Sequence, residues 1–400
     1  RRDLRPQQRW GRDLLSLADR RPSRSLREAL PRAARPFHGG RRRASRPLLR
    51  AGARPGRGCG GGRARTPGRG DEDRGASHGC RGLRDRAQRD DGADRARDRA
   101  TARGARRGER RGERRRGGIL IERRVTAAGL RWRVRETGVD SGRTLLLLHG
   151  FAGEASYWDY PASLLAGRLC VAPDLPGHGG TDPPIPPERW RMDRLADAML
   201  LLLDALSIER VDLVGYSMGG RAAVHLACSA PGRIGSLTLV GASAGIADPK
   251  ERRERLAQDE ELASLLEREG IEAFVARWEA LPLFESQRRL PEEVLSRTRR
   301  MRLAQDPRAL AAALRAFGTG SLEPLYDRIA DLPMRVLLVA GEEDAKFVAI
   351  ARSLALAMPR ARAEVVPHAG HSVPLERPEA FAGLLESFLS RASMEGGIGS

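Results

Sequence analysis

The stretch Gly215-Tyr-Ser-Met-Gly-Gly-Arg221 decides the fold of this chain. It fits the pattern Gly-x-Ser-x-Gly, in which a sharp turn from a strand into a helix lifts a serine hydroxyl above a sheet. The flanks suit this turn, because residues 211–214 are short and apolar and residues 221–228 are rich in helix formers. The glycines are needed because a strained turn leaves no room for a Cβ atom. The stretch therefore predicts that Ser217 is a catalytic nucleophile.

The pattern from residue 119 onward predicts an α/β protein. Short apolar runs, typical of strands, alternate with stretches of helical spacing. The expected strands lie at 119–121, 130–134, 145–148, 169–172, 211–214, 236–240, 335–339 and 363–366, and the clearest helices at 192–206, 219–230 and 378–389. The first two strands are expected to form a hairpin. Continuous apolar runs of this kind are buried on both faces, so we expect a doubly wound, mostly parallel sheet.

The chain is expected to divide into an extension, a core, a cap and a tail. The residues between Val240 and Met334 have a charged and largely helical pattern, and an insertion there would cover the carboxyl ends of the strands. The expected boundaries are 1–118 for the extension, 119–244 and 325–391 for the core, 245–324 for the helical cap, and 392–400 for a flexible tail.

The positive charge of the chain is concentrated in residues 1–118. The net charge is +20, yet this Arg-rich extension without Lys accounts for all of it, and the remainder is mildly acidic. The extension has no sustained hydrophobic period, so we expect it to be disordered. Three interpretations are open: a basic arm that binds RNA or DNA, a targeting peptide, or upstream GC-rich DNA translated by mistake. The third is favoured, because the chain starts with Arg1 rather than Met, and a nucleic-acid partner is not expected.

Cysteine usage and hydropathy indicate a protein of the reducing cytoplasm. Cys59, Cys80, Cys170 and Cys228 show no C-x-x-C pairing, so neither a disulfide nor a metal site is expected. No apolar run reaches the roughly 20 residues that a membrane span requires. We expect no membrane contact, no cofactor, and a monomer or small homo-oligomer.

A serine at such a turn needs a base, and the base needs an acid that orients it. Where this turn occurs, the chain order is Ser, then Asp or Glu, then His. The acid is expected directly after the strand at 335–339, where Glu342, Glu343 and Asp344 compete.

The base is expected shortly after the strand at 363–366. His368 and His371 both follow this strand. We favour His371, because Gly370 before it suits a loop that projects the imidazole toward the nucleophile.

Two backbone N–H groups are expected to stabilise an oxyanion. They belong to Met218, at the start of a helix where the dipole adds positive potential, and to Phe151. His149 is interpreted as a brace of the loop that carries Phe151, and His178 as a structural residue.

The order of these motifs resembles that of the α/β-hydrolase superfamily. The motifs are Leu148-His-Gly-Phe151, Asp174-Leu-Pro-Gly-His-Gly179, the turn at Ser217, Gly341-Glu-Glu-Asp344 and Ala369-Gly-His371. The resemblance covers residues 119–390 and implies an α/β-hydrolase fold with a helical cap. Four further strings are similar to the family of 2-succinyl-6-hydroxy-2,4-cyclohexadiene-1-carboxylate synthases of menaquinone biosynthesis. They are residues 215–221, Trp278 with 281–284, residues 314–320 and residues 341–347.

This family implies an elimination rather than a hydrolysis. Its reaction removes a proton from 2-succinyl-5-enolpyruvyl-6-hydroxy-3-cyclohexene-1-carboxylate and expels pyruvate. The resemblance selects Asp344 as the acid. His371 would take the Ser217 proton, the serine oxygen would abstract the substrate proton, and Asp344 would hold the imidazole in place.

Arginines are the expected ligands of this polycarboxylate substrate, because guanidinium groups match carboxylate geometry. Arg221 lies one turn after Ser217, where an ordinary ester hydrolase has little need of a cation. The resemblance assigns Arg255 and Arg302 as the cap's carboxylate ligands. A slip in register would replace them by Arg252, Arg253, Arg299 or Arg300.

Three further residues are implied in substrate binding. Tyr216 and Trp278 would pack on the substrate ring, and Lys346 is one of only two lysines in the chain. The chain departs from the family's pattern at Glu279, where a Tyr often follows the Trp, so we expect that wall of the pocket to differ from the family's.

Two other functions compete with the synthase. A carboxylesterase or a hydrolase of C–C bonds would keep the same three catalytic residues but would leave Arg221 and the cap arginines unpaired. A nucleic-acid-binding protein would use residues 1–118 and keep the folded domain as a scaffold, and the intact Ser, Asp and His in the correct order weigh against it.

Overall fold

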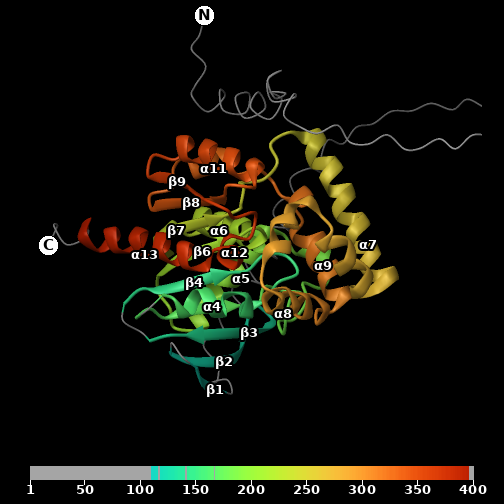
Figure 1. Cartoon of the computed structure of the whole chain (residues 1–400), viewed down its shortest axis with the longest axis horizontal. Coiled ribbons are helices and arrows are strands. Elements are labelled where there is room, and N and C mark those ends of the chain that lie inside the picture. Colours follow the sequence, from blue (N-terminus) through green and yellow to red (C-terminus); the bar gives the residue numbers. More distant parts are fainter. Residues whose placement is uncertain (1–109, 116–117, 140–141, 166, 396–400) are drawn as a thin grey trace, which may run out of the picture. The chain divides into compact units, whose positions relative to one another are not determined.

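One mixed sheet runs through the part of the chain that the computed structural model describes, which is residues 110–115, 118–139, 142–165 and 167–395. Its nine strands lie in the order β1-β2-β3-β5-β4-β6-β7-β8-β9. They are β1 (Arg110–Arg115), β2 (Gly118–Ala127), β3 (Leu130–Thr137), β4 (Thr144–Leu148), β5 (Cys170–Pro173), β6 (Val211–Tyr216), β7 (Ile234–Val240), β8 (Arg335–Gly341) and β9 (Ala361–Val366). Strands β4 to β9 pair in parallel, and β1, β2 and β3 form an antiparallel edge. The expected mostly parallel sheet and its opening hairpin are confirmed (Figure 1).

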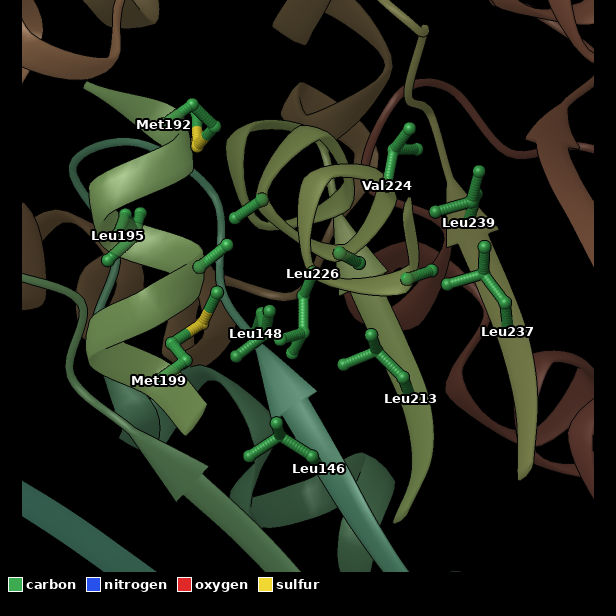
Figure 2. Packing of buried hydrophobic residues seen from close by; sticks show 14 of the residues in the cluster. Leu146, Leu148, Met192, Leu195, Met199, Leu213, Val224, Leu226, Leu237 and Leu239 are labelled. Atoms are coloured by element: carbon green, nitrogen blue, oxygen red, sulfur yellow. The ribbon is translucent and has the colours of Figure 1, made fainter. Parts of the chain in front are cut away.

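Helices cover both faces of the central strands. Along β4 every residue is buried, and alternate side chains point to opposite faces. Leu146 and Leu148 pack toward α5 (Met192–Ala205), α6 (Met218–Ser229) and α11 (Ala345–Ala357), as Figure 2 shows for α5 and α6. Leu145 and Leu147 pack toward α4 (Asp159–Ser163) and α13 (Pro378–Glu395). Each such buried leucine stabilises the fold by roughly 1.5–3 kcal/mol.

The helical insertion expected between β7 and β8 is present. It contains α7 (Pro249–Glu279), η4 (Pro282–Arg289), α8 (Glu292–Leu303), α9 (Pro307–Phe317), η5 (Thr319–Ser321) and α10 (Tyr326–Ile329). Phe274 and Leu310 centre a separate apolar cluster that also includes Ala152, from the loop after β4. The cap helices α7, α8 and α9 therefore lie together (Figure 1), packed on a loop of the core. The other short helices are η1 (Ala155–Trp158), η2 (Pro187–Arg189), η3 (Pro231–Arg233) and α12 (Val373–Glu376).

The structure corrects two of the expected boundaries. Residues 110–115, expected to be disordered, form β1, which pairs with residues 118–123 of β2. An edge strand needs backbone partners but no buried side chains, so an Arg-rich sequence can form one. Helix α13 continues to Glu395, into the expected tail, because neither Gly nor Pro interrupts residues 384–395. Residues 1–109 and 396–400 lie outside the described part of the chain.

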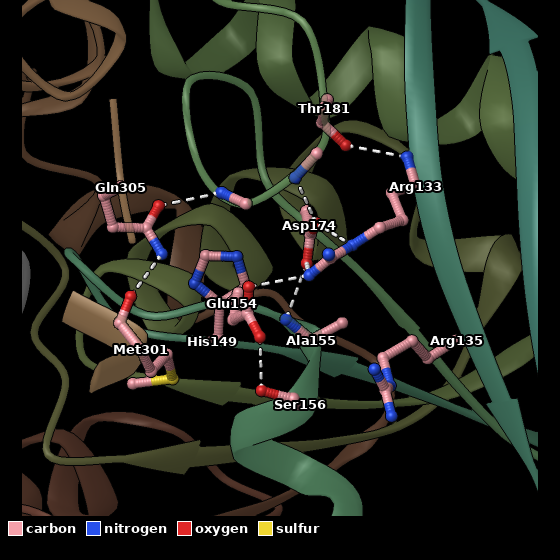
Figure 3. Close-up of polar contacts among 12 residues, drawn as sticks. Arg133, Arg135, His149, Glu154, Ala155, Ser156, Asp174, Thr181, Met301 and Gln305 are labelled. Carbon is pink, nitrogen blue, oxygen red and sulfur yellow. Dashed lines mark hydrogen bonds and ion pairs between the residues drawn. The ribbon is translucent and has the colours of Figure 1, made fainter. Parts of the chain in front are cut away.

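A buried ion-pair network fixes the loop that follows β4 (Figure 3). The carboxylate of Asp174 is fully buried and accepts hydrogen bonds of 2.7 Å from the backbone N–H groups of Ala155 and Gly180. Arg133 of β3 forms ion pairs with Asp174 at 2.6 Å and with Glu154 at 2.7 Å. One guanidinium thus pairs with two carboxylates and ties the loop to the antiparallel edge of the sheet.

We predict that Arg133→Met lowers the free energy of unfolding by about 3 kcal/mol, because it leaves the Asp174 carboxylate buried without its cation. The matched control is Arg131→Met on the same strand, which removes only an exposed ion pair with Asp182. That change should cost less than about 1 kcal/mol. Urea unfolding of both variants measures the difference, and equal losses would contradict the prediction.

Candidate active site

Ser217 occupies a strained turn between β6 and α6. Its backbone φ is +52°, in the left-handed region. Two glycines make the turn possible. A Cβ atom on Gly215 would lie 2.4 Å from the carbonyl oxygen of Gly219, and one on Gly219 would lie 2.3 Å from the carbonyl oxygen of Leu148. The spacing of glycines in the sequence therefore reflects direct backbone contacts.

His371 lies between Ser217 and Asp344. Its Nε2 atom is 3.1 Å from the Ser217 hydroxyl oxygen, and its Nδ1 atom is 2.7 Å from a carboxylate oxygen of Asp344. The second oxygen of Asp344 accepts the backbone N–H of Phe347 at 3.3 Å, so the same carboxylate begins helix α11. The three side chains have the geometry of a nucleophile, a base and an acid that orients the base.

The competing acids and the competing histidine have other partners. Glu342 accepts the backbone N–H of His368 at 3.1 Å, and Glu343 forms an ion pair with Arg289 at 2.6 Å. His368 itself is exposed. The structure brings none of them to Ser217.

Both residues proposed as oxyanion donors line one cavity. Met218 is the first residue of α6, where a backbone N–H has no partner within the helix. Phe151 follows His149, whose imidazole is braced at both nitrogens. Its Nδ1 lies 2.8 Å from the carbonyl oxygen of Gly150, and its Nε2 accepts the N–H of Leu175 at 2.9 Å. Burial lowers the pKa of His149, so the ring is held neutral in the form that this bracing requires.

A cavity of about 860 Å³ opens above Ser217. Both the core and the cap contribute to its walls. Of the predicted site residues, those that line it are Phe151, Tyr216, Ser217, Met218, Arg221, Arg255, Trp278, Arg302, Lys346 and His371. Asp344 does not line the cavity and contacts His371 from behind.

Arg221 faces this cavity without an acidic partner. Its Nε atom is buried and has no hydrogen-bond partner among the described residues, and none of their carboxylates forms an ion pair with it. Burial, followed by the charge of Arg255, lowers the pKa of Arg221 to about 10. The group remains cationic at neutral pH, so the cavity presents a guanidinium that favours an anion.

The two cap arginines line the cavity with acids beside them. Arg255 forms an ion pair of 2.7 Å with the buried Asp259, and Arg302 forms one of 3.0 Å with Glu279. Glu279, the departure from the family's pattern, thus holds a proposed ligand in place. The alternatives Arg252, Arg253, Arg299 and Arg300 do not line the cavity.

A family model described as alpha/beta hydrolase fold matches residues 143–378. The chain belongs to the α/β-hydrolase family. It is 38% identical over 262 residues to a protein of Bacillus subtilis (strain 168) named as a putative 2-succinyl-6-hydroxy-2,4-cyclohexadiene-1-carboxylate synthase, with 66% of this chain and 96% of the relative covered. It is 31% identical over 246 residues to the synthase of that name from Serratia proteamaculans (strain 568), with 61% of this chain and 92% of the relative covered. The solved structure of MenH from S. aureus superposes with a TM-score of 0.62 at 32% identity, over 66% of this chain and 98% of that one.

Aromatic rings form one wall of this α/β-hydrolase cavity. Trp278 lies with its ring centre 5.4 Å from Phe274, 5.5 Å from Phe151 and 5.6 Å from Phe284. Tyr216 stacks on Tyr157 at 5.1 Å. Trp278 and Tyr216 therefore serve the apolar core as well as the cavity surface.

Two residues that hold the loop of His371 were not found from the sequence. Glu376 accepts the N–H groups on both sides of His371, from Gly370 at 2.7 Å and from Ser372 at 3.0 Å. Gln287 of the cap donates to the Ser372 hydroxyl at 3.0 Å. Only the spacing of Glu376 after His371 could have suggested its role, and no local signal marks Gln287.

Two other kinds of feature, a membrane-spanning helix and a metal-binding cluster, are not found among the described residues. Within the described ranges, no helix is long and apolar enough to cross a membrane. The same residues contain no group of three or more His, Cys, Asp or Glu side chains that could hold a metal ion.

His178 is buried beside the loop that carries Phe151. Its ring centre is 5.2 Å from that of His149 and 5.3 Å from that of Phe151. Burial, with a contribution from His149, lowers the pKa of His178 to about 3. The folded protein therefore keeps this imidazole neutral at mildly acidic pH, whereas the unfolded chain protonates it.

This difference predicts a loss of stability in acid. The unfolded chain binds the proton near the ordinary histidine pKa of about 6.5, so stability falls as pH drops below that value. Between pH 7.5 and 5.5, His178 should account for a loss of about 1.4 kcal/mol. In His178→Gln this part of the loss should be absent, which urea unfolding at both pH values measures. Parallel pH profiles for the two proteins would refute the assignment.

Proposed function

We propose that this chain is a 2-succinyl-6-hydroxy-2,4-cyclohexadiene-1-carboxylate synthase of menaquinone biosynthesis. It removes a proton from 2-succinyl-5-enolpyruvyl-6-hydroxy-3-cyclohexene-1-carboxylate and eliminates pyruvate. Relatives that carry the synthase name match over nearly their whole length. The observation that carries the proposal is the unpaired Arg221 guanidinium in the cavity above Ser217. A neutral ester would leave that charge buried and unsatisfied.

Ser217 and His371 act together as the base in this proposal. The serine oxygen takes the ring proton while its own proton moves over 3.1 Å to His371 Nε2. The C–H electrons form a new ring double bond, the existing double bond shifts, and the bond to the enolpyruvyl oxygen breaks. The imidazolium then returns a proton to the leaving enolate, which gives pyruvate. Asp344, 2.7 Å from Nδ1, stabilises the imidazolium during the step.

The oxyanion donors stabilise the charge that develops on the substrate. Removal of the ring proton beside the succinyl ketone places negative charge on the ketone oxygen. The N–H groups of Met218 and Phe151 face the position for that oxygen in this proposal, and one such donor contributes roughly 3 kcal/mol to transition-state stabilisation.

The substrate's carboxylates bind the arginines. Arg221 takes one of them without displacing a protein acid. Arg255 and Arg302 take the others while Asp259 and Glu279 keep their guanidinium groups oriented. Lys346, exposed at the cavity wall, adds a further positive charge, and Tyr216 and Trp278 contact the ring.

The domain division belongs to the same proposal. Residues 245–324 act as a cap on a core formed by residues 119–244 and 325–391, and β1 extends that core toward the N-terminus. We also propose that the protein works in the reducing cytoplasm and is a monomer or a small homo-oligomer. The alternative of nucleic-acid binding concerns residues 1–118, and most of this segment lies outside the described part of the chain.

Pyruvate release from the enolpyruvyl substrate tests the function. The full chain should release one pyruvate for each substrate molecule consumed. A coupled assay with lactate dehydrogenase measures this release. Ser217→Ala should lower kcat by about 10²–10⁴-fold, because proton transfer loses its positioned group. Efficient cleavage of p-nitrophenyl esters without pyruvate release would instead identify a carboxylesterase.

Arg221→Ala should lower kcat/KM about 100-fold, since it removes a charge-assisted contact worth several kcal/mol. Its free energy of unfolding should not fall, because the lost guanidinium has no acidic partner in the folded protein. The matched control is Arg253→Ala, an exposed cap arginine that does not line the cavity. Activity of Arg221→Ala equal to that of this control would remove Arg221 from the site.

A further inference from the structure

The cap segment η4 touches a proposed substrate ligand on one side and the base on the other. The ring centre of Phe284 lies 6.4 Å from that of His371. The guanidinium carbon of Arg302 lies 5.3 Å from the centre of the same Phe284 ring. The residue that receives a carboxylate and the residue that receives a proton are thus separated by one short segment of the cap.

A chain of hydrogen bonds runs through Gln287 of this segment. Arg302 Nη2 donates to Gln287 Oε1 at 3.4 Å, and Gln287 Nε2 donates to the Ser372 hydroxyl at 3.0 Å. Ser372 also shares a hydrogen bond of 2.5 Å with the hydroxyl of Tyr216. Ser372 directly follows the base in sequence, and Tyr216 directly precedes the nucleophile. The chain therefore ends beside both groups that move the proton.

The amide of Gln287 has a defined direction in this chain. Its oxygen faces a donor that cannot accept, the guanidinium of Arg302, so a flipped amide would place two donors against each other. Gln287, Ser372 and Arg302 are 5%, 2% and 8% exposed. Water therefore cannot readily replace either hydrogen bond, and buried polar chains of this kind are sensitive to the loss of one member.

We propose that Gln287 is a positioning residue that couples carboxylate binding at Arg302 to the alignment of His371. A carboxylate bound to Arg302 fixes the guanidinium, the guanidinium fixes the Gln287 amide, and the amide fixes Ser372 and the loop of the base. Substrate lacking that carboxylate would bind without completing this alignment. The inference rests on the proposed function only in taking Arg302 as a carboxylate ligand.

A purely structural role for Gln287 makes a different prediction. If the amide only fills buried space, its loss weakens the cap and acts independently of Arg302. Two changes at independent sites have additive effects, whereas members of one network do not. A double-mutant cycle therefore separates the two roles.

The cycle combines Gln287→Met with Arg302→Lys. The lysine keeps the charge but loses the planar fork that reaches the Gln287 oxygen. Each single change should lower kcat about tenfold through misalignment of the base, and the double variant should lower it little further. In Gln287→Met the KM should change less than about threefold, since no substrate contact is removed. Gln287→Glu provides a second variant, which keeps the size and the acceptor but loses the donor to Ser372.

Gln305→Met is the matched control for this cycle. Gln305 is also a buried cap glutamine that bonds to the core, by accepting the N–H of Gly179 at 2.8 Å, and its own amide N–H donates to the carbonyl oxygen of Met301 at 3.1 Å (Figure 3). Its effect on kcat should add to that of Arg302→Lys. Additive effects for Gln287→Met as well would overturn the proposal.

A readout that needs no substrate separates this inference from the proposed function. The ¹⁵N chemical shifts of the His371 ring, assigned with His371→Gln, report the hydrogen bonding of the imidazole at a fixed pH. Arg302→Lys should change these chemical shifts in the wild-type background and leave them unchanged in the Gln287→Met background. The same shift in both backgrounds would refute the coupling. If the wild type released no pyruvate but the shift depended on Gln287, the synthase assignment would fail and the coupling would stand.

Discussion

The close approach of backbone at the Ser217 turn is the constraint on which the rest of the site depends. Gly219 lies so near the carbonyl of Leu148 that no side chain fits between them. This contact fixes the start of α6 against the end of β4, and thereby sets Ser217 beside the loop of Phe151. His371 and Asp344 arrive from the ends of later strands, because the carboxyl ends of parallel strands meet at one edge. The alignment of Ser217, His371 and Asp344 therefore depends on the order of the strands that carry them.

Much of this arrangement could be predicted from the sequence, because it rests on local signals. Apolar runs gave the central strands, and the glycines around Ser217 gave the turn. The strand β1 was missed, because edge pairing of 110–115 with β2 leaves no hydrophobic pattern. Gln287 was missed for a different reason: its partners Arg302 and Ser372 are distant in sequence, and only the packing of the cap on the core brings them together. Hydrogen bonds between residues so far apart in the sequence leave no periodic pattern from which they could be predicted.

The arginines that line the cavity are of two kinds, those with an acidic partner in the protein and one without. Arg255 and Arg302 form ion pairs with Asp259 and Glu279, so their guanidinium groups are oriented before any ligand binds. Arg221 has no such acid, and its desolvated charge is a cost that the folded protein bears. Under the proposed function, Arg255 and Arg302 would offer guanidinium groups that are already oriented, and Arg221 would gain the partner that it lacks when a substrate carboxylate binds. Burial lowers the pKa of His149, so this braced imidazole is neutral and adds no further charge beside Phe151.

The short strand β1 has a consequence for any shortened form of this protein. It covers the hydrogen-bonding edge of β2 from residue 118 to residue 123. A chain that began at residue 119 would leave that edge bare, with unpaired N–H and C=O groups along an otherwise intact sheet. Bare edges recruit strands from neighbouring molecules, so such a chain would be prone to self-association. Keeping residues 110–118 would protect the sheet from this aggregation, although no residue of β1 is near Ser217 in sequence or in strand order.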